Sequence, residues 1–169
     1  MKIGLLGGSF NPAHTGHLHI SEIALKKLGL SQVWWLVSPQ NPLKPQKGME
    51  SFENRLQSAR QIACNPKIKV LDIETRLKTQ YTIDVLYKLT AKYPATEFVW
   101  LMGADNLISF PRWKKWEEIL QLVKVHVFDR AEFFYPATAS RQYQKYKNKI
   151  TYHRIRKSNL SSTKIRELI

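Results

Sequence analysis

Short apolar runs alternate along this chain with segments of helical periodicity, and this alternation restricts the fold more than any other feature of the sequence. Residues 2–6 are apolar and end in glycines, which is typical of a buried strand. Residues 16–28 carry apolar side chains at helical spacing before Gly29, a natural helix stop. By the same criteria, further strands are expected over 33–38, 68–73, 97–103, 123–128 and 150–154. Further helices are expected over 51–64, 82–92, 113–121 and 162–168, whereas residues 131–149 are poorly patterned.

Strands that alternate with helices form βαβ units, so the pattern predicts an α/β fold in which a mostly parallel sheet is flanked by helices. In such sheets ligands bind outside the carboxyl ends of the strands. We therefore expect the functional site in the loops that follow residues 6, 38, 73 and 103.

Length and apolar patterning limit the class of protein. The chain has 169 residues, the size of one domain, and no repeat or linker divides it, so we expect a single domain over 1–169. No apolar run approaches the roughly 18 residues that cross a bilayer, so we expect no membrane partner. The N-terminus lacks the apolar core of a signal peptide, and Cys64 is the single cysteine. These features predict a cytoplasmic location.

The charge balance calls for an anionic partner. The formal net charge is +14, and basic residues gather between Arg141 and Arg166 with no acidic residue among them. Such an excess is compatible with nucleic acid, with a phosphorylated small molecule, or with a solvated basic surface. Composition alone leaves these three open.

The segment from Gly7 to His17, GGSFNPAHTGH, follows the first expected strand and opens the first expected helix. Glycines let the backbone approach a ligand closely, and a helix start offers N–H groups and a partial positive charge to a phosphate. His14 and His17 are one helical turn apart and can face the same pocket. Two histidines can also ligate a metal, but no third ligand pattern accompanies them, and we expect no protein-held metal. The remaining alternative is a glycine turn with a histidine cap.

Near the other end, Leu160 to Arg166 reads LSSTKIR. Hydroxyls and open N–H groups at a helix start, with an arginine one turn later, make a clamp for a polyphosphate. Taken alone, the same residues are a good N-cap.

Together these two segments resemble the signature motifs of the nucleotidylyltransferase superfamily. Three further segments resemble nicotinate-nucleotide adenylyltransferases in particular: TQYTIDVL at 79–86, GADNL at 103–107 and FPRW at 110–113. NPLK at 41–44 resembles the loop that carries a phosphate-binding lysine. Asn11 and Ala13 stand where many members have Asp and Pro. The resemblance runs in order from residue 3 to about residue 167 and implies a Rossmann-like nucleotidylyltransferase domain.

The activity that the resemblance implies is transfer of the adenylyl group of ATP to nicotinate mononucleotide, which gives nicotinate adenine dinucleotide and pyrophosphate in NAD biosynthesis. A phosphate oxygen is already nucleophilic at pH 7, so the protein needs to position groups and neutralise charge rather than supply a base. His14 and His17 would act as the catalytic residues at the α-phosphate. Mg²⁺ would be bound mainly through the ATP phosphates.

The resemblance also implies two sets of binding residues. Those for ATP and phosphate are Gly8, Ser9, Phe10, Lys44, Gly103, Asp105, Ser162, Thr163 and Arg166. Those for the mononucleotide are Tyr81, Thr82, Ile83 and Trp113, with backbone N–H groups around the first three reading the nicotinate carboxylate and the indole stacking on the pyridine ring. Core packing is the alternative for Trp113 and is preferred for Trp116, and Asp84 is interpreted as an acid of the helix start.

Two other functions remain as alternatives. One is a sibling adenylyltransferase that acts on nicotinamide mononucleotide or pantetheine phosphate. The other is a basic nucleic-acid-binding module, for which the sequence offers no recognition helix and few interleaved aromatic residues. We expect ATP and nicotinate mononucleotide as partners and no nucleic acid. The sequence does not indicate an oligomeric state.

Overall fold

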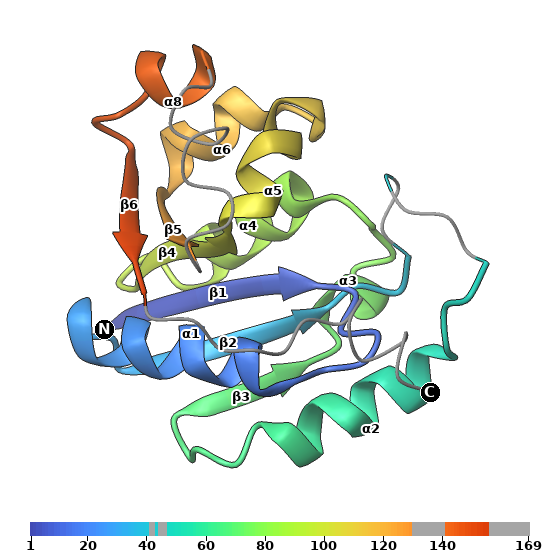
Figure 1. Ribbon diagram of the computed structural model, residues 1–169. Coiled ribbons are helices and arrows are strands. Elements are labelled where there is room, and N and C mark those ends of the chain that lie inside the picture. Colours follow the sequence, from blue (N-terminus) through green and yellow to red (C-terminus); the bar gives the residue numbers. More distant parts are fainter. Residues whose placement is uncertain (41–42, 44–46, 130–140, 156–169) are drawn as a thin grey trace.

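A six-stranded, wholly parallel sheet forms the centre of the molecule, with the strand order β3-β2-β1-β4-β5-β6 (Figure 1). The computed structural model describes residues 1–40, 43, 47–129 and 141–155. The strands are β1 (Lys2–Gly8), β2 (Gln32–Val37), β3 (Ile68–Leu71), β4 (Glu97–Gly103), β5 (Lys124–Asp129) and β6 (Ile150–Arg154). The predicted α/β class with a parallel sheet is confirmed.

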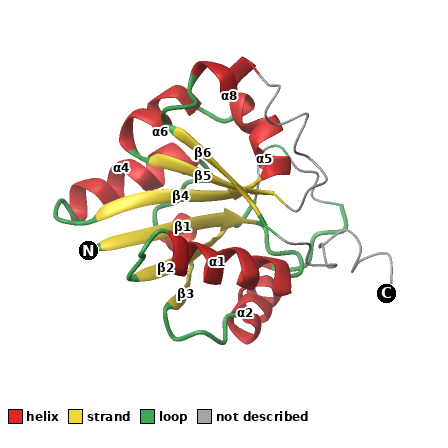
Figure 2. Ribbon diagram, turned by 60° about the vertical axis from the view of Figure 1, so that its left-hand side comes forward, coloured by secondary structure: helices red, strands yellow, loops and turns green. Residues whose placement is uncertain are grey.

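Helices cover both faces of this sheet (Figure 2). One face carries α1 (Thr15–Lys27) and α2 (Phe52–Ile62). The other carries α4 (Thr82–Lys92), α5 (Ala104–Ser109) and α6 (Trp116–Leu122). Shorter elements complete the described chain: α3 (Ile73–Arg76), the 3-10 turn η1 (Phe110–Arg112) and α8 (Arg141–Lys145).

The sheet separates two apolar cores because successive side chains of a strand point to opposite faces. Leu5 and Trp100 belong to the core under α4 and α6, whereas Leu6 and Trp35 belong to the core under α1 and α2. All four are buried. Strands buried on both faces need nearly continuous apolar sequence, which explains the short apolar runs that predicted them.

The two central strands, β1 and β4, stop pairing before their carboxyl ends. Leu6 pairs with Leu101, and this is the last pairing between β1 and β4. Beyond it, Gly7 pairs with Leu36 of β2, and Met102 pairs with Val127 of β5. The connection after β1 runs to α1 on one face, and the connection after β4 runs to α5 on the other (Figures 1 and 2). This is the topological switch point, where a crevice for ligands forms in doubly wound sheets.

Some elements differ from the sequence predictions. The strand expected over 68–73 ends at Leu71, and α3 follows at once; α5 likewise begins directly after β4. Both helices are too short to show a periodicity. The helix expected over 113–121 begins only at Trp116, because Lys115 adopts the left-handed conformation with φ of 52°. The helix expected over 162–168 lies outside the described residues. Among the helices that are described, none has the length and apolar character needed to cross a membrane.

Candidate active site

The loop after β1 places a buried hydroxyl at the switch point. Phe10 adopts the left-handed conformation with φ of 48°, and its buried ring stacks on Trp35 with ring centroids 5.1 Å apart. This turn leaves Ser9 buried, and Ser9 Oγ has no hydrogen-bond partner among the described residues. A buried hydroxyl without a partner costs stability, so its retention points to a ligand that completes the bond.

His14 and His17 lie side by side at the start of α1, with ring centroids 4.0 Å apart. Nδ1 of His14 accepts a hydrogen bond from the Gly16 N–H at 3.0 Å, and Nδ1 of His17 accepts one from the His14 N–H at 3.2 Å. An Nδ1 that accepts carries no proton, so each neutral ring holds its proton on Nε2. The capping bonds therefore fix two imidazole N–H donors at a helix N-terminus, which suits an anion.

Arg55 of α2 ties the loops around these histidines together. Its buried guanidinium donates to the carbonyl oxygens of Ser9 at 2.6 Å, Ser38 at 2.7 Å, Pro39 at 2.8 Å and Glu50 at 3.1 Å. Burial lowers the pKa of Arg55, and the nearby carboxylates oppose this shift. A buried cation bound to carbonyl oxygens holds the loop after β1 against the loop after β2. Sequence analysis did not identify this residue, because nothing local marks an arginine in an amphipathic helix as buried.

Asn11 makes a second tie between the same two loops. Its Nδ2 donates to the Gly48 carbonyl oxygen at 3.1 Å, and its Oδ1 accepts from the Glu50 N–H at 3.1 Å. An ionised Asp at this position can accept but cannot donate. The departure from the commoner Asp therefore adds one bond.

Glycine leaves room for a neighbouring side chain near the ends of both central strands. A Cβ at Gly7 would lie 2.7 Å from the ring of Trp100, and a Cβ at Gly103 would lie 2.5 Å from Asp105 Oδ1. The absence of a side chain at Gly103 lets the Asp105 carboxylate, on the exposed start of α5, lie back over the strand end. Gly103 and Asp105, both predicted from sequence, thus occupy the β4 side of the crevice.

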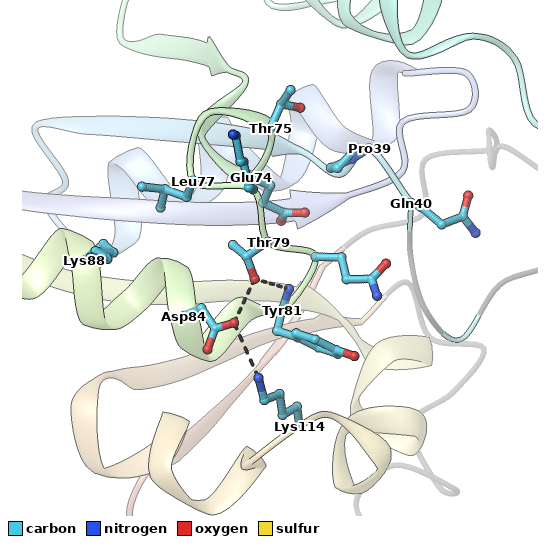
Figure 3. Close-up of a pocket in the computed structure, with 12 residues that line it drawn as sticks. Pro39, Gln40, Glu74, Thr75, Leu77, Thr79, Tyr81, Asp84, Lys88 and Lys114 are labelled. Carbon is cyan, nitrogen blue, oxygen red and sulfur yellow. Dashed lines mark hydrogen bonds and ion pairs between the residues drawn. The ribbon is translucent and has the colours of Figure 1, made fainter.

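The turn that enters α4 is organised by one hydroxyl (Figure 3). Thr79 Oγ1 accepts from the Tyr81 N–H at 3.1 Å and donates to Asp84 Oδ2 at 2.8 Å. Lys114 Nζ lies 3.5 Å from Asp84 Oδ2 and 4.2 Å from the centroid of the Tyr81 ring. Asp84 therefore stabilises the turn, in agreement with its interpretation as an acid of the helix start.

The same contacts bear on the N–H groups expected to read the nicotinate carboxylate. The N–H of Tyr81 already donates a hydrogen bond to Thr79 Oγ1. Thr82 and Ile83 are the first two residues of α4, and N–H groups at such positions have no acceptor within their helix. Spacing along the chain could not reveal this, because the bond depends on how the turn folds back on Thr79.

A cavity of about 610 Å³ opens beside this turn. Its lining includes Pro39 after β2, Glu74 of α3, and Thr79 and Tyr81 of the turn (Figure 3). Glu74 is 5% exposed, and its Oε2 has no hydrogen-bond partner among the described residues. Burial raises the pKa of Glu74 to about 7, and the hydrogen bond from the Ser38 side chain opposes the rise. Sequence analysis placed the site in the loop after residue 73 but did not identify Glu74.

Some of the remaining predicted residues are described by the structure, and others lie outside the described residues. Trp113 is partly buried and meets Trp100 and Phe110 edge-on, at centroid distances of 6.0 and 5.3 Å. Trp116 packs edge-on against Phe110 and Tyr146, as core packing predicts. Phe10 contributes a core ring, so only its backbone can border a phosphate. Lys44, Ser162, Thr163 and Arg166 lie outside the described residues. Over the described ranges, no three His, Cys, Asp or Glu side chains gather into a possible metal site.

Comparison with known proteins gives a family and close relatives. The model of the family described as cytidylyltransferase-like matches residues 5–168. A protein of Parvibaculum lavamentivorans named as a probable nicotinate-nucleotide adenylyltransferase is 56% identical over 140 residues, which are 83% of this chain and 70% of that protein. A protein of Methylorubrum extorquens with the same name is 47% identical over 85% of this chain and 78% of its own length.

Among solved structures, nicotinic acid mononucleotide adenylyltransferase of Plasmodium falciparum has the same fold. The complex of that protein with NaAD superposes with a TM-score of 0.81 over 98% of this chain and 82% of the other, at 19% sequence identity. At this identity the likeness concerns the fold alone.

Proposed function

Because this chain belongs to the cytidylyltransferase-like family, and within it to the nicotinate-nucleotide adenylyltransferases, we propose that it transfers the adenylyl group of ATP to nicotinate mononucleotide. The mononucleotide phosphate oxygen attacks the α-phosphorus of ATP and forms the new P–O bond. The bond from the α-phosphorus to the bridging oxygen breaks, and pyrophosphate leaves with the electron pair. The product, nicotinate adenine dinucleotide, assigns the reaction to NAD biosynthesis.

The observation that carries this assignment is the donor group at the switch point. Ser9 Oγ and the Nε2 atoms of His14 and His17 belong to one loop and the helix start that follows it. The attack needs no general base, because the phosphate nucleophile is ionised at neutral pH. What it needs is charge neutralisation on the pentavalent phosphorus, and fixed N–H donors supply it without reorganising.

The mononucleotide end of the proposed site combines the cavity beside α4, which Tyr81 lines, with Thr82, Ile83 and Trp113, which lie outside that lining. The N–H groups of Thr82 and Ile83 donate hydrogen bonds to the nicotinate carboxylate, and the partly buried ring of Trp113 stacks on the pyridine. Lys114 follows Trp113 and reaches the ring of Tyr81, so the two segments approach each other here. Donors aimed at this end favour the acid over the amide, whose NH₂ group would face them.

The ATP end uses the other side of the crevice. Asp105 accepts hydrogen bonds from the ribose hydroxyls, and Gly8 and Gly103 let the backbone approach the nucleotide. Lys44, Ser162, Thr163 and Arg166 are proposed to hold phosphates on the strength of the motifs alone. Mg²⁺ is proposed to arrive with ATP and to be held by its phosphates and water, since the described residues offer no cluster of ligands for it.

A pyrophosphate-release assay with ATP and a panel of acceptors tests the function. We expect release with nicotinate mononucleotide, a lower kcat/KM with nicotinamide mononucleotide, and none with pantetheine phosphate. Preference for either of the last two substrates would assign the chain to the corresponding sibling activity. No release with any of them would contradict the proposal.

His17→Ala tests the donor group directly. Removing a donor that acts on the transition state should lower turnover by about a hundredfold or more. His19→Ala is the matched control, because it removes an imidazole two residues further along α1, where side chains do not share a face with His17. Turnover of the His17 variant within threefold of the wild type would show that the residue is structural.

A further inference from the structure

Glu74 is a buried acid in the cavity that the proposed function assigns to the mononucleotide. It belongs to α3, which begins two residues after β3, and its side chain reaches the cavity wall between Pro39 and Thr79 (Figure 3). One carboxyl oxygen is bonded by Ser38, and the other, Oε2, has no partner among the described residues. Glu74 lines the cavity, so a ligand there is the nearest source of a partner for this buried oxygen.

The charges around this carboxyl do not hold its pKa at the ordinary value. Lys78, Lys88 and Lys114 line the same cavity, as does Asp84, which pairs with Lys114. Arg55 lies behind Ser38 and bonds its carbonyl oxygen rather than Glu74. Burial outweighs these charges and raises the pKa of Glu74 to about 7. The protonated form of Glu74 therefore persists to a higher pH than that of an exposed glutamic acid.

We propose that Glu74 determines substrate specificity in the mononucleotide cavity, where its protonated carboxyl donates a hydrogen bond to the carboxylate of the pyridine ring. The inference rests on the proposed function and goes beyond it by adding a side chain to the backbone donors of α4. Ionised, the same group would place a negative charge beside the carboxylate and weaken binding. When the substrate binds to ionised Glu74, one proton is taken up from solution. That proton lies between an oxygen atom of Glu74 and an oxygen atom of the substrate carboxylate.

The amide substrate meets the same residue differently. A nicotinamide group carries no charge, and its NH₂ can donate to an ionised Glu74. The ionised residue therefore penalises the acid and not the amide. Selectivity for acid over amide should fall as the pH rises through the range in which Glu74 loses its proton.

Steady-state kinetics from pH 6.5 to pH 9 separate this role from a structural one. In the wild-type enzyme, the KM for nicotinate mononucleotide should rise about tenfold or more between pH 7 and pH 9, while the KM for ATP follows no such trend. The substrate phosphate titrates near pH 6, below most of this range. Glu22→Gln removes an exposed carboxylate from α1 and should reproduce the wild-type profile.

Two variants of Glu74 give opposite results. Glu74→Gln replaces the acid with a permanent neutral donor, so its KM for the acid substrate should not rise with pH and should be about tenfold below the wild-type value at pH 9. Glu74→Leu removes the donor, so its KM for the acid substrate should be about tenfold above the wild-type value at pH 7 and equally independent of pH. A residue that only supports the fold would change the two KM values together and would leave no difference in pH profile between these variants.

Calorimetry of mononucleotide binding at pH 7.5, in buffers of different ionisation enthalpy, provides a second measurement that needs only the Gln variant. The wild type should take up more protons on binding than Glu74→Gln does. Equal proton uptake, or a wild-type KM that falls as the pH rises, overturns the inference, because Glu74 would then act as an acceptor or not at all. If the wild type forms no nicotinate adenine dinucleotide, the proposed function itself is wrong.

Discussion

Two buried oxygen atoms of the candidate site, Ser9 Oγ and Glu74 Oε2, have no hydrogen-bond partner within the described part of the chain. Burying a polar atom in this way costs about 1–3 kcal/mol. A carboxyl costs more once it ionises. In the proposed site, a ligand group would complete the hydrogen bonds of both atoms.

Glu74→Gln should therefore stabilise the protein in a pH-dependent way. The folded state raises the pKa of Glu74 from 4.5 to about 7, so it favours the protonated form. Stability is then lost as the pH rises from about 4.5 through about 7, and the penalty is complete above that range. We expect the variant to have a free energy of unfolding up to about 3 kcal/mol higher than the wild type at pH 8, and nearly equal at pH 4.5. Urea unfolding at both values checks this; the same difference at both would contradict it.

Trp113→Ala tests the pyridine end of the site. The indole meets Trp100 and Phe110 edge-on and remains partly exposed. Loss of a stacking ring should raise the KM for the mononucleotide about tenfold or more and leave the KM for ATP nearly unchanged. An unchanged mononucleotide KM, or a variant that does not fold, would assign Trp113 to the core.

At the scale of elements, α2 contributes to the site through one side chain, that of Arg55, which extends from the helix to the neighbouring loops. Arg55 bonds carbonyl oxygens from two loops, and these loops flank the start of α1. Arg55→Lys keeps the charge, but an ammonium group cannot reproduce four bonds of a planar guanidinium. We expect the free energy of unfolding to fall by about 3 kcal/mol, with a parallel loss of kcat/KM.

Arg60→Lys is the matched control for that experiment, since Arg60 is exposed on the same helix. Its free energy of unfolding should stay within about 0.5 kcal/mol of the wild type. If Arg55→Lys behaved like this control, the guanidinium would not be what joins the loops.

The elements also show where local patterns suffice. Strands β2, β4, β5 and β6 lie within one residue of their predicted positions, and β1 ends two residues later than predicted, because each is a short apolar run bounded by polar or turn residues. Helix α6 begins three residues late, because η1 and the left-handed Lys115 intervene. Contacts around Trp113 determine the conformation of that turn. The seven residues of α6 are too few for their periodicity to predict where the helix begins.

At the scale of the whole molecule, the net charge of +14 has to be reconciled with a small-molecule substrate. Both substrates are anionic, and a positive field speeds their capture. The proposed function therefore needs no nucleic acid to explain the charge. Contacts with phosphates in a nucleic acid would be sequence-independent and sensitive to salt.

Duplex DNA should accordingly bind weakly and lose its binding between about 50 and 200 mM salt. Fluorescence anisotropy with a labelled duplex measures this, and we expect ATP to remain bound over the same range of salt. Tight, sequence-dependent binding at the higher salt concentration would favour the nucleic-acid alternative.

The sequence by itself determined the order and type of the long elements, the pair of histidines at the start of α1, and the polar turn that leads into α4. All of these depend on neighbours a few residues apart, through apolar spacing, capping and turn chemistry. The place of Asp105 at the end of β4 belongs to the same group.

Only the tertiary structure decided which strands are neighbours, and hence that the crevice opens where β1 and β4 separate. It also decided that Arg55 is buried, that the N–H of Tyr81 is already bonded, and that Glu74 faces a cavity. Burial and the pKa it changes are set by atoms from segments far apart along the chain. From its own polar segment, Glu74 would be predicted to be an exposed carboxylate. It is buried because the loop after β2 and the turn before α4 pack around it.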